Sequence, residues 1–312
     1  MARYNIGLWA PTRASMSPIS IDTPGMWVES LKADFLAALG RNPDFNVIDG
    51  LDFRKAHIRK GDVFLGDFNF ADLDLFFWFG ELDRKHNSFH VDILEAIGQH
   101  TIVINDAGAL RIALDKVLTQ LHLSRKGITV PYFLFVSRSN VAEVRELVNQ
   151  RPFVLKPRLG SFGVGITKIT SHDHLVDVVD YSEFDAHFLE EFIESPPDEF
   201  IGINIIGGNL VSGYGKERSK FRGWKVFDRD RRGGGMVPKA PSPEQIQIAF
   251  DVARATGLDM LGVDIIRSST GQDFVIDVNS FPGLYPAMSE QSGVDVAELL
   301  VAMIRRKLEK GG

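Results

Sequence analysis

A continuous apolar run at Leu73–Phe79 (Leu-Asp-Leu-Phe-Phe-Trp-Phe) constrains the fold of this chain more than any other segment. Such a run fits a strand buried on both faces, as in a parallel sheet covered by helices. Shorter strands are predicted at Tyr4–Trp9 and Thr101–Ile104, and apolar residues recur at helical spacing in Met26–Leu39 and His90–Ile97. Strands that alternate with helices in this way predict an α/β layer built on a parallel sheet.

The next part of the chain is typical of a smaller α+β unit. One long helix is expected before it at Ala107–Leu123, followed by Gly127 as its cap. A second helix is expected at Asn140–Asn149, with Ser139 as its cap. The strands expected around it are Tyr132–Val136, Phe153–Lys156, Ile166–Ile169 and His187–Phe192.

The last third of the chain predicts two pairs of strands and two helices. Phe200–Ile206 and Leu210–Tyr214 flank Gly207-Gly208, which is a hairpin signal. A polar, basic loop is expected at Ser219–Lys239. The remaining elements are a helix at Pro243–Thr256 ended by Gly257, strands at Leu261–Ile266 and Phe274–Val278, and a closing helix at Val294–Glu309.

Composition excludes several classes of function. The 312 residues include 35 Lys or Arg and 41 Asp or Glu, which gives a net charge of −6. A chain with this balance is a poor candidate for sequence-independent binding to nucleic acid, so no nucleic-acid partner is expected. The chain has no cysteine, which excludes disulfides, thiolate metal sites and a cysteine nucleophile.

No segment of the sequence predicts a membrane partner. The first residues lack the apolar stretch of a secretory signal, and no apolar run approaches about 18 residues, the length of a transmembrane helix. We therefore expect a cytoplasmic protein of two or three domains.

The segment Val154–Gly165 combines a lysine with a cluster of glycines. A predicted strand delivers Lys156, and Gly160, Gly163 and Gly165 follow it. Glycine lets backbone N–H groups face an anion without a Cβ atom in the way, and lysine adds a charge for a phosphate oxygen. The spacing matches neither the P-loop nor the dinucleotide-binding fingerprint. Phosphate binding and an ordinary glycine-containing hairpin are both open at this point.

Oxygen-bearing side chains lie on the last two predicted strands. Asp277 and Asn279 are two residues apart, so their side chains point to the same face. Asp264, on the preceding strand, can meet them there. Two carboxylates and an amide suit Mg²⁺, which shares its coordination shell with nucleotide phosphates. Acids that face water at strand ends are the alternative interpretation.

Two more segments suit parts of a nucleotide or an acidic substrate. Phe188–Ile193, followed by Asp198–Phe200, can offer backbone groups to adenine and a carboxylate to ribose. An amphipathic edge strand is the alternative for this segment. The chain is strongly basic between Lys216 and Arg232, and arginine suits phosphate or carboxylate groups, although such runs are usually solvated.

In the order of these motifs the chain resembles the ATP-grasp superfamily. The motifs are Asp115-Lys116, Lys156 with its glycine loop, Glu190-Glu191-Phe192-Ile193, and Asp264 with Asp277-x-Asn279. The most similar branch is that of the RimK-like and glutathione-synthetase-like carboxylate–amine ligases. The resemblance implies an α/β ATP-grasp fold in three parts: a Rossmann-like pre-ATP-grasp domain at 1–122, a central α+β lid at 123–192, and a catalytic domain at 193–312.

The same resemblance implies roles for the candidate residues. ATP would be bound by Lys116, Lys156, Gly160, Ser161, Gly163, Gly165, Glu190, Glu191, Phe192, Ile193 and Glu199. Mg²⁺, with Mn²⁺ as the alternative ion, would be held by Asp264, Asp277 and Asn279. The charge of an acyl phosphate would be held by Arg218, Arg231 and Arg232.

The chain departs from the family pattern at two positions. Asp277 stands where the family usually has glutamate, and Gly202 stands near a position where the RimK-like pattern has arginine. The charge missing at position 202 is expected to come from Lys216, Arg218 or the run Arg229–Arg232.

The activity implied by the resemblance is ATP-dependent formation of an amide or peptide bond through an acyl phosphate. The expected partners are a small carboxylate and an amine, with an amino acid or peptide as the substrate class. The protein would contribute mainly positioning and charge neutralisation. A phosphotransferase on the same fold and a non-catalytic ATP-binding regulatory protein are the alternatives. A homodimer is the default expectation for assembly.

Overall fold

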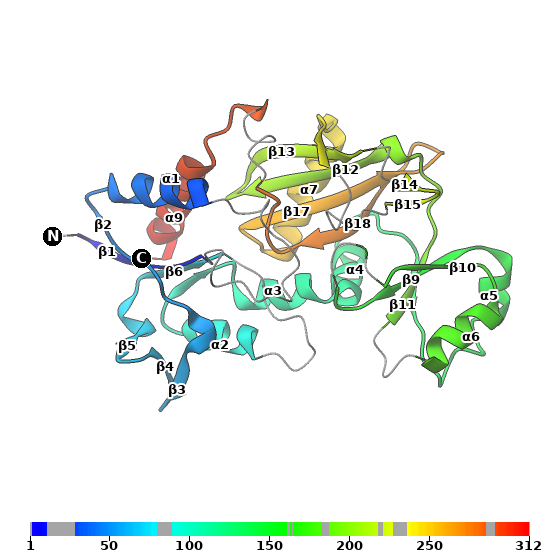
Figure 1. The fold of residues 1–312 in the computed structure, drawn as a ribbon, viewed down its shortest axis with the longest axis horizontal. Helices are drawn as coiled ribbons and strands as arrows, with labels where there is room; N and C mark the ends of the chain where they lie inside the picture. Colours follow the sequence, from blue (N-terminus) through cyan, green and yellow to red (C-terminus); the bar gives the residue numbers. More distant parts are fainter. Residues whose placement is uncertain are drawn as a thin grey trace.

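The computed structural model describes residues 2–10, 29–79, 89–160, 163, 165–181, 187–217, 221–226, 236–284 and 291–311 of the chain. The larger sheets follow one another along the long axis of the molecule (Figure 1). The N-terminal sheet lies at one end and a small sheet with two helices lies at the other. A five-stranded sheet lies between them.

The N-terminal sheet is parallel, with strand order β2-β1-β6-β7. Its elements are β1 (Tyr4–Trp9), β2 (Phe45–Ile48), β6 (Leu75–Trp78) and β7 (Ile102–Ile104), with helices α1 (Glu29–Gly40), α2 (His90–Ile97) and α9 (Val296–Gly311) around them. Every residue of β6 is buried, which confirms the predicted parallel α/β layer. A small antiparallel sheet of β3 (His57–Arg59), β4 (Asp62–Leu65) and β5 (Phe68–Asn69) adjoins it.

The prediction of a single helix at Ala107–Leu123 is wrong, because the helix is interrupted at Asp115. Helix α3 (Ala107–Leu114) ends there and α4 (Lys116–Arg125) begins. Asp115 has an extended backbone, and its Oδ1 accepts hydrogen bonds from the backbone N–H groups of Val117 (2.9 Å) and Leu118 (3.2 Å). Asp115 therefore caps a new helix instead of continuing the old one.

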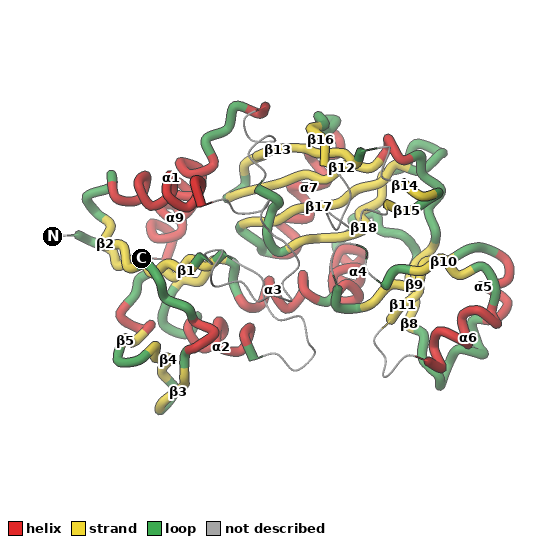
Figure 2. The backbone as a smooth tube through the Cα atoms, viewed as in Figure 1, coloured by secondary structure: helices red, strands yellow, loops and turns green. Residues whose placement is uncertain are grey.

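The small sheet is antiparallel, with strand order β10-β9-β11-β8. It consists of β8 (Phe133–Phe135), β9 (Phe153–Pro157), β10 (Thr167–Ile169) and β11 (His187–Glu191). Helices α5 (Arg145–Gln150) and α6 (His172–Tyr181) lie together at this end of the molecule (Figure 2). A separate apolar cluster that includes Phe153 and Leu189 joins sheet and helices.

The helix expected at Asn140–Asn149 starts later than predicted, at Arg145. The Asn140 side chain accepts a hydrogen bond from the Ser137 backbone N–H (2.8 Å) and donates one to the Phe135 carbonyl (3.2 Å). These local bonds hold the preceding residues in turns, so Ser139 is not the cap of the helix.

The central five-stranded sheet is antiparallel, with strand order β16-β13-β12-β17-β18. It consists of β12 (Phe200–Ile206), β13 (Asn209–Lys216), β16 (Met236–Pro238), β17 (Met260–Arg267) and β18 (Asp273–Asn279). Helix α7 (Pro243–Thr256) packs on it and contacts α4. The predicted hairpin, strand pair and helix are therefore confirmed.

The sequence predicted a loop over the whole segment 219–239, and this prediction is wrong in part. It contains β14 (Phe221–Arg222), β15 (Lys225–Val226) and β16, all antiparallel to their neighbours.

Among the helices of the described residues, none is both long and apolar enough to cross a membrane.

Candidate active site

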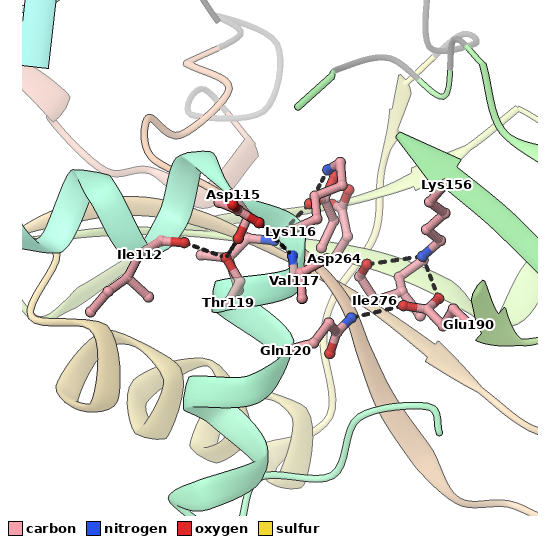
Figure 3. A network of polar contacts seen from close by, with 12 residues as sticks. Ile112, Asp115, Lys116, Val117, Thr119, Gln120, Lys156, Glu190, Asp264 and Ile276 are labelled. Carbon is pink, nitrogen blue, oxygen red and sulfur yellow. Dashed lines mark hydrogen bonds and ion pairs between the residues drawn. The ribbon is translucent and has the colours of Figure 1, made fainter. Parts of the chain in front are cut away.

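The two predicted phosphate-binding lysines converge on adjacent residues of β18 (Figure 3). Lys156, on β9, donates a hydrogen bond from Nζ to the carbonyl oxygen of Ile276 (3.3 Å). Lys116, the first residue of α4, forms an ion pair with Asp277. Both side chains are largely buried. The fold thus brings two ammonium groups together from elements that lie far apart in the sequence.

A buried acid holds Lys156 from the other side. Lys156 forms an ion pair with Glu190 on β11, and Gln120 on α4 donates a hydrogen bond from Nε2 to Glu190 Oε2 (2.9 Å; Figure 3). Glu190 is only 2% exposed. Burial raises the pKa of its carboxyl above the ordinary range, while the Lys156 charge opposes this rise.

Gln120 was missed in the sequence. Its position carried a signal, because it follows Lys116 by one helical turn and so lies on the same face of α4. Both side chains of this helix therefore reach the same network.

The start of α4 is tied to the glycine-loop strand. Arg158, just after β9, forms an ion pair with the capping residue Asp115. The backbone N–H of Lys116 donates to the carbonyl oxygen of Arg158 (3.0 Å). These contacts fix the position of the first turn of α4, from which the Lys116 side chain extends.

The predicted metal ligands lie on neighbouring strands in matching register. Asp264 on β17 is directly opposite Asp277 on β18, and Gly262 is opposite Asn279. Among the described residues, no group of three or more His, Cys, Asp or Glu side chains gathers into a metal site. The candidate ligands Asp264, Asp277 and Asn279 are two carboxylates and an amide. Oxygen donors of this kind fit Mg²⁺ or Mn²⁺.

The charge around Asp264 is balanced by two side chains of β13. Tyr214 donates a hydrogen bond from its hydroxyl to Asp264 Oδ1 (2.9 Å). Burial raises the pKa of Asp264, and Lys216 and this hydrogen bond lower it. Burial lowers the pKa of Lys216, while Asp264 opposes this change. Lys216 is thus a strand residue beside the candidate metal site, whereas Tyr214 had not been singled out in the sequence.

The glycine loop turns with a left-handed backbone. Gly163 and Gly165 have φ values of 67° and 78°, a region in which glycine carries no steric penalty. Gly160 precedes them within the described residues, whereas Ser161 lies outside these residues. The β14–β15 hairpin touches this loop, because Lys225 Nζ donates to the carbonyl oxygen of Ile166 (2.7 Å).

The predicted adenine-binding segment connects β11 to β12. Glu191 forms an ion pair with Arg151 (2.7 Å) and the Phe192 ring meets the edge of Trp224 (5.7 Å between centroids). Their backbone N–H groups donate to the carbonyls of residues 132 and 152. Ile193 follows Phe192, and Glu199 ends a short 3-10 helix before β12.

The three predicted catalytic arginines cannot be compared with this geometry. Arg218, Arg231 and Arg232 all lie outside the described residues. Of the predicted basic segment, Lys216 lies beside Asp264, and Lys225 contacts the glycine loop.

Comparisons with known proteins show the family to which the chain is related. A family model described as a RimK-like ATP-grasp domain matches residues 113–304. A probable alpha-L-glutamate ligase from Legionella pneumophila (strain Corby) is 30% identical over 217 residues, which are 69% of this chain and 70% of that protein.

Solved structures match over nearly the whole chain. A RimK domain ATP-grasp protein from Sphaerobacter thermophilus DSM 20745 has a TM-score of 0.66 at 14% identity, covering 96% of this chain and 98% of that chain. The D-alanine–D-alanine ligase from Bacillus anthracis complexed with ATP has a TM-score of 0.65 at 17% identity, covering 99% and 100%.

The fold and these matches define an ATP-dependent carboxylate–amine ligase of the ATP-grasp class, as predicted. Within that class, the chain belongs to the RimK-like ATP-grasp family.

Proposed function

We propose that the protein joins the carboxylate of an amino acid, a peptide or a related small acid to an amine, and that it converts ATP to ADP and phosphate. The observation that carries the proposal is the convergence of Lys116 and Lys156 on β18, beside Asp264 and Asp277. Two cations next to two acids suit a metal–triphosphate complex. The relative named a probable alpha-L-glutamate ligase supports an amino acid as one substrate.

The chemistry divides into two displacements. A carboxylate oxygen of the substrate attacks the γ-phosphorus of ATP, and the bond to the β-phosphate oxygen breaks, which yields an acyl phosphate and ADP. The amine nitrogen then attacks the acyl carbon, phosphate leaves, and the nitrogen loses a proton to form the amide.

The chain contributes charge and position to these steps. Lys116, Lys156 and the loop Gly160, Ser161, Gly163 and Gly165 would hold the phosphates. Glu190, Glu191, Phe192 and Ile193 would face adenine, and Glu199 would face the ribose. Asp264, Asp277 and Asn279 would hold Mg²⁺, which neutralises the phosphates when bound. Arg218, Arg231 and Arg232 would hold the acyl phosphate.

Lys216 joins this set as a further cation for the acyl phosphate. The support is its place on β13, two residues beyond Tyr214 and therefore on the same face of the strand. Asp264, to which Tyr214 donates, opposes the burial-induced fall in the Lys216 pKa. A cation here supplies the charge that is missing at Gly202.

The proposed function goes with a three-domain organisation of the chain. We propose a pre-ATP-grasp domain at 1–122, a lid at 123–192 and a catalytic domain at 193–312. The partners would be small-molecule substrates, with no nucleic acid and no membrane, and a homodimer is the proposed assembly. A cytoplasmic location would give the enzyme access to ATP and amino acids.

The test follows ADP release with ATP, Mg²⁺ and pools of amino acids, peptides and other small acids. Hydroxylamine in a parallel set traps an acyl phosphate as a hydroxamate, and mass spectrometry identifies the amide. Lys156→Met should lower hydroxamate formation by about a hundredfold or more, whereas Lys126→Met, at the exposed end of α4, should retain it. A stable phosphorylated product without hydroxamate would instead indicate a phosphotransferase. No turnover with any pool would contradict the proposal for these substrate classes.

A further inference from the structure

One row of residues crosses the central sheet at the candidate metal site. Tyr214 on β13 is directly opposite Gly202 on β12, and Gly202 is directly opposite Asp264 on β17. Asp264 is in turn opposite Asp277 on β18. Tyr214 and Asp264 are therefore two strands apart, with Gly202 between them.

Tyr214 spans this gap because Gly202 has no side chain. Adjacent strands lie about 4.8 Å apart, so a side chain must cross about 10 Å to reach the second strand. The Tyr214 ring lies directly over Gly202, and a Cβ atom added at position 202 would come within 2.1 Å of the ring atom Cζ. No other amino acid fits at position 202 while the ring keeps this place.

The hydroxyl at the far end of the ring fixes one oxygen of Asp264. It donates to Oδ1 at 2.9 Å, and the tyrosine is only 5% exposed, so the ring has little freedom to turn away. Oδ2 is then the oxygen of Asp264 that this hydrogen bond leaves to a cation. A donor that orients a metal-binding carboxylate in this way commonly strengthens the site.

We propose that Tyr214 is a positioning residue that orients Asp264 toward the divalent cation bound with ATP, and that Gly202 is the position that admits it. The inference rests on the proposed function in taking Asp264 as a metal ligand. The proposal makes Tyr214 and Gly202 a matched pair. A larger residue at position 202 would displace the ring and so remove the hydrogen bond, while Tyr214 and Asp264 themselves stay unsubstituted.

The experiment measures Mn²⁺ binding to the full-length protein with a non-hydrolysable ATP analogue, by electron paramagnetic resonance of free Mn²⁺. Tyr214→Phe removes the hydroxyl and keeps the ring, and we expect roughly tenfold weaker Mn²⁺ binding. Binding of the analogue without metal and the unfolding temperature should change little. Tyr4→Phe is the matched control, since it removes a tyrosine hydroxyl from β1 in the N-terminal sheet and should leave Mn²⁺ binding unchanged.

Gly202→Ala is the second variant, and it keeps the test decisive if Tyr214→Phe folds poorly. It should displace the ring and weaken Mn²⁺ binding to a similar extent. In the Tyr214→Phe background, Gly202→Ala should change Mn²⁺ affinity by less than about twofold, because the hydrogen bond is already missing.

Two results would overturn the inference. One is Mn²⁺ binding by Tyr214→Phe within about twofold of the parent protein. The other is a parent protein that binds no more Mn²⁺ than the analogue binds alone. Failure of the proposed ligase activity is a separate result, because Mn²⁺ binding that depends on Tyr214 would stand even if no amide or hydroxamate forms.

Discussion

The cap at Asp115 gives a prediction whose size follows from the structure. Its carboxylate caps α4 through two backbone N–H groups and also forms an ion pair with Arg158. Asp115→Ala removes the cap, which contributes about 1 kcal/mol, and a charged hydrogen bond, which contributes about 1.5 kcal/mol. The expected loss of about 2.5 kcal/mol should speed amide exchange in α4 by about 70-fold.

Asp115→Asn separates the two contributions. Asparagine is as good a cap as aspartate, so only the ion pair with Arg158 is lost, and exchange should rise by about tenfold. The matched controls are at Asp106, which caps α3 through the N–H groups of Gly108 (2.8 Å) and Ala109 (3.1 Å). Asp106→Ala should cost about 1 kcal/mol, or about fivefold in exchange, and Asp106→Asn almost nothing.

The assay is hydrogen exchange followed by mass spectrometry of peptides that cover α3 and α4. It reports local opening, which a global unfolding curve does not isolate. Equal effects of Asp115→Ala and Asp106→Ala would refute the contribution of Arg158. An Asp115→Asn variant as damaged as Asp115→Ala would refute the contribution of the cap. Because Lys116 begins α4, we also expect Asp115→Ala to raise the KM for ATP.

Three other perturbations have defined outcomes. Lys156→Met should lower kcat/KM for ATP by about a hundredfold or more in the ADP-release assay, because a buried phosphate partner is lost. Asp264→Asn should raise the unfolding temperature at pH 8 and have less effect near pH 4. Burial raises the pKa of this carboxyl, so the native state loses stability as the pH rises from the ordinary carboxyl pKa toward the higher folded-state pKa. Gly213→Ala should destabilise the fold by about 1–3 kcal/mol, since the new Cβ would lie 2.4 Å from the Lys239 carbonyl oxygen, whereas Gly40→Ala meets no atom and should be neutral in thermal unfolding.

The parts of the fold that the sequence predicted correctly depend on local signals. Helix α7 begins after Ser242, which forms a capping box with Gln245, and ends at Gly257, which has a φ of 75°. Both signals lie within a few residues of the helix ends, so the predicted bounds Pro243–Thr256 agree with the structure. The apolar run around β6 is equally local, because burial on both faces needs no polar position.

The break at Asp115 is stabilised by a contact that the sequence does not reveal. Apolar spacing continues through residues 107–123, and this continuity predicted one helix. The aspartate inside that stretch caps α4, and Arg158, which follows β9 and lies 43 residues further along the chain, adds an ion pair to this cap. Helix propensity is too weak to override such a contact.

The candidate site divides in the same way. Its lysines and acids were predicted from the order of the motifs along the sequence. Tyr214 could not be predicted in this way, because its role depends on strand register across three neighbouring strands. Gly202 carried a weak signal, since glycine within a strand often marks the close approach of another group.

Under the proposed function, the pairing of the site's charges links nucleotide binding to metal binding. Lys116 and Lys156 each have a carboxylate partner within the chain, Asp277 and Glu190. Phosphate oxygens that take over these lysines leave both acids in need of other partners, because an uncompensated buried charge is strongly unfavourable. Glu190 keeps the hydrogen bond from Gln120, whereas Asp277 is directly opposite Asp264 on the neighbouring strand. A divalent cation is the partner that suits two adjacent carboxylates. Nucleotide without metal would therefore add negative charge beside two acids, so we infer that the site favours the two ligands together.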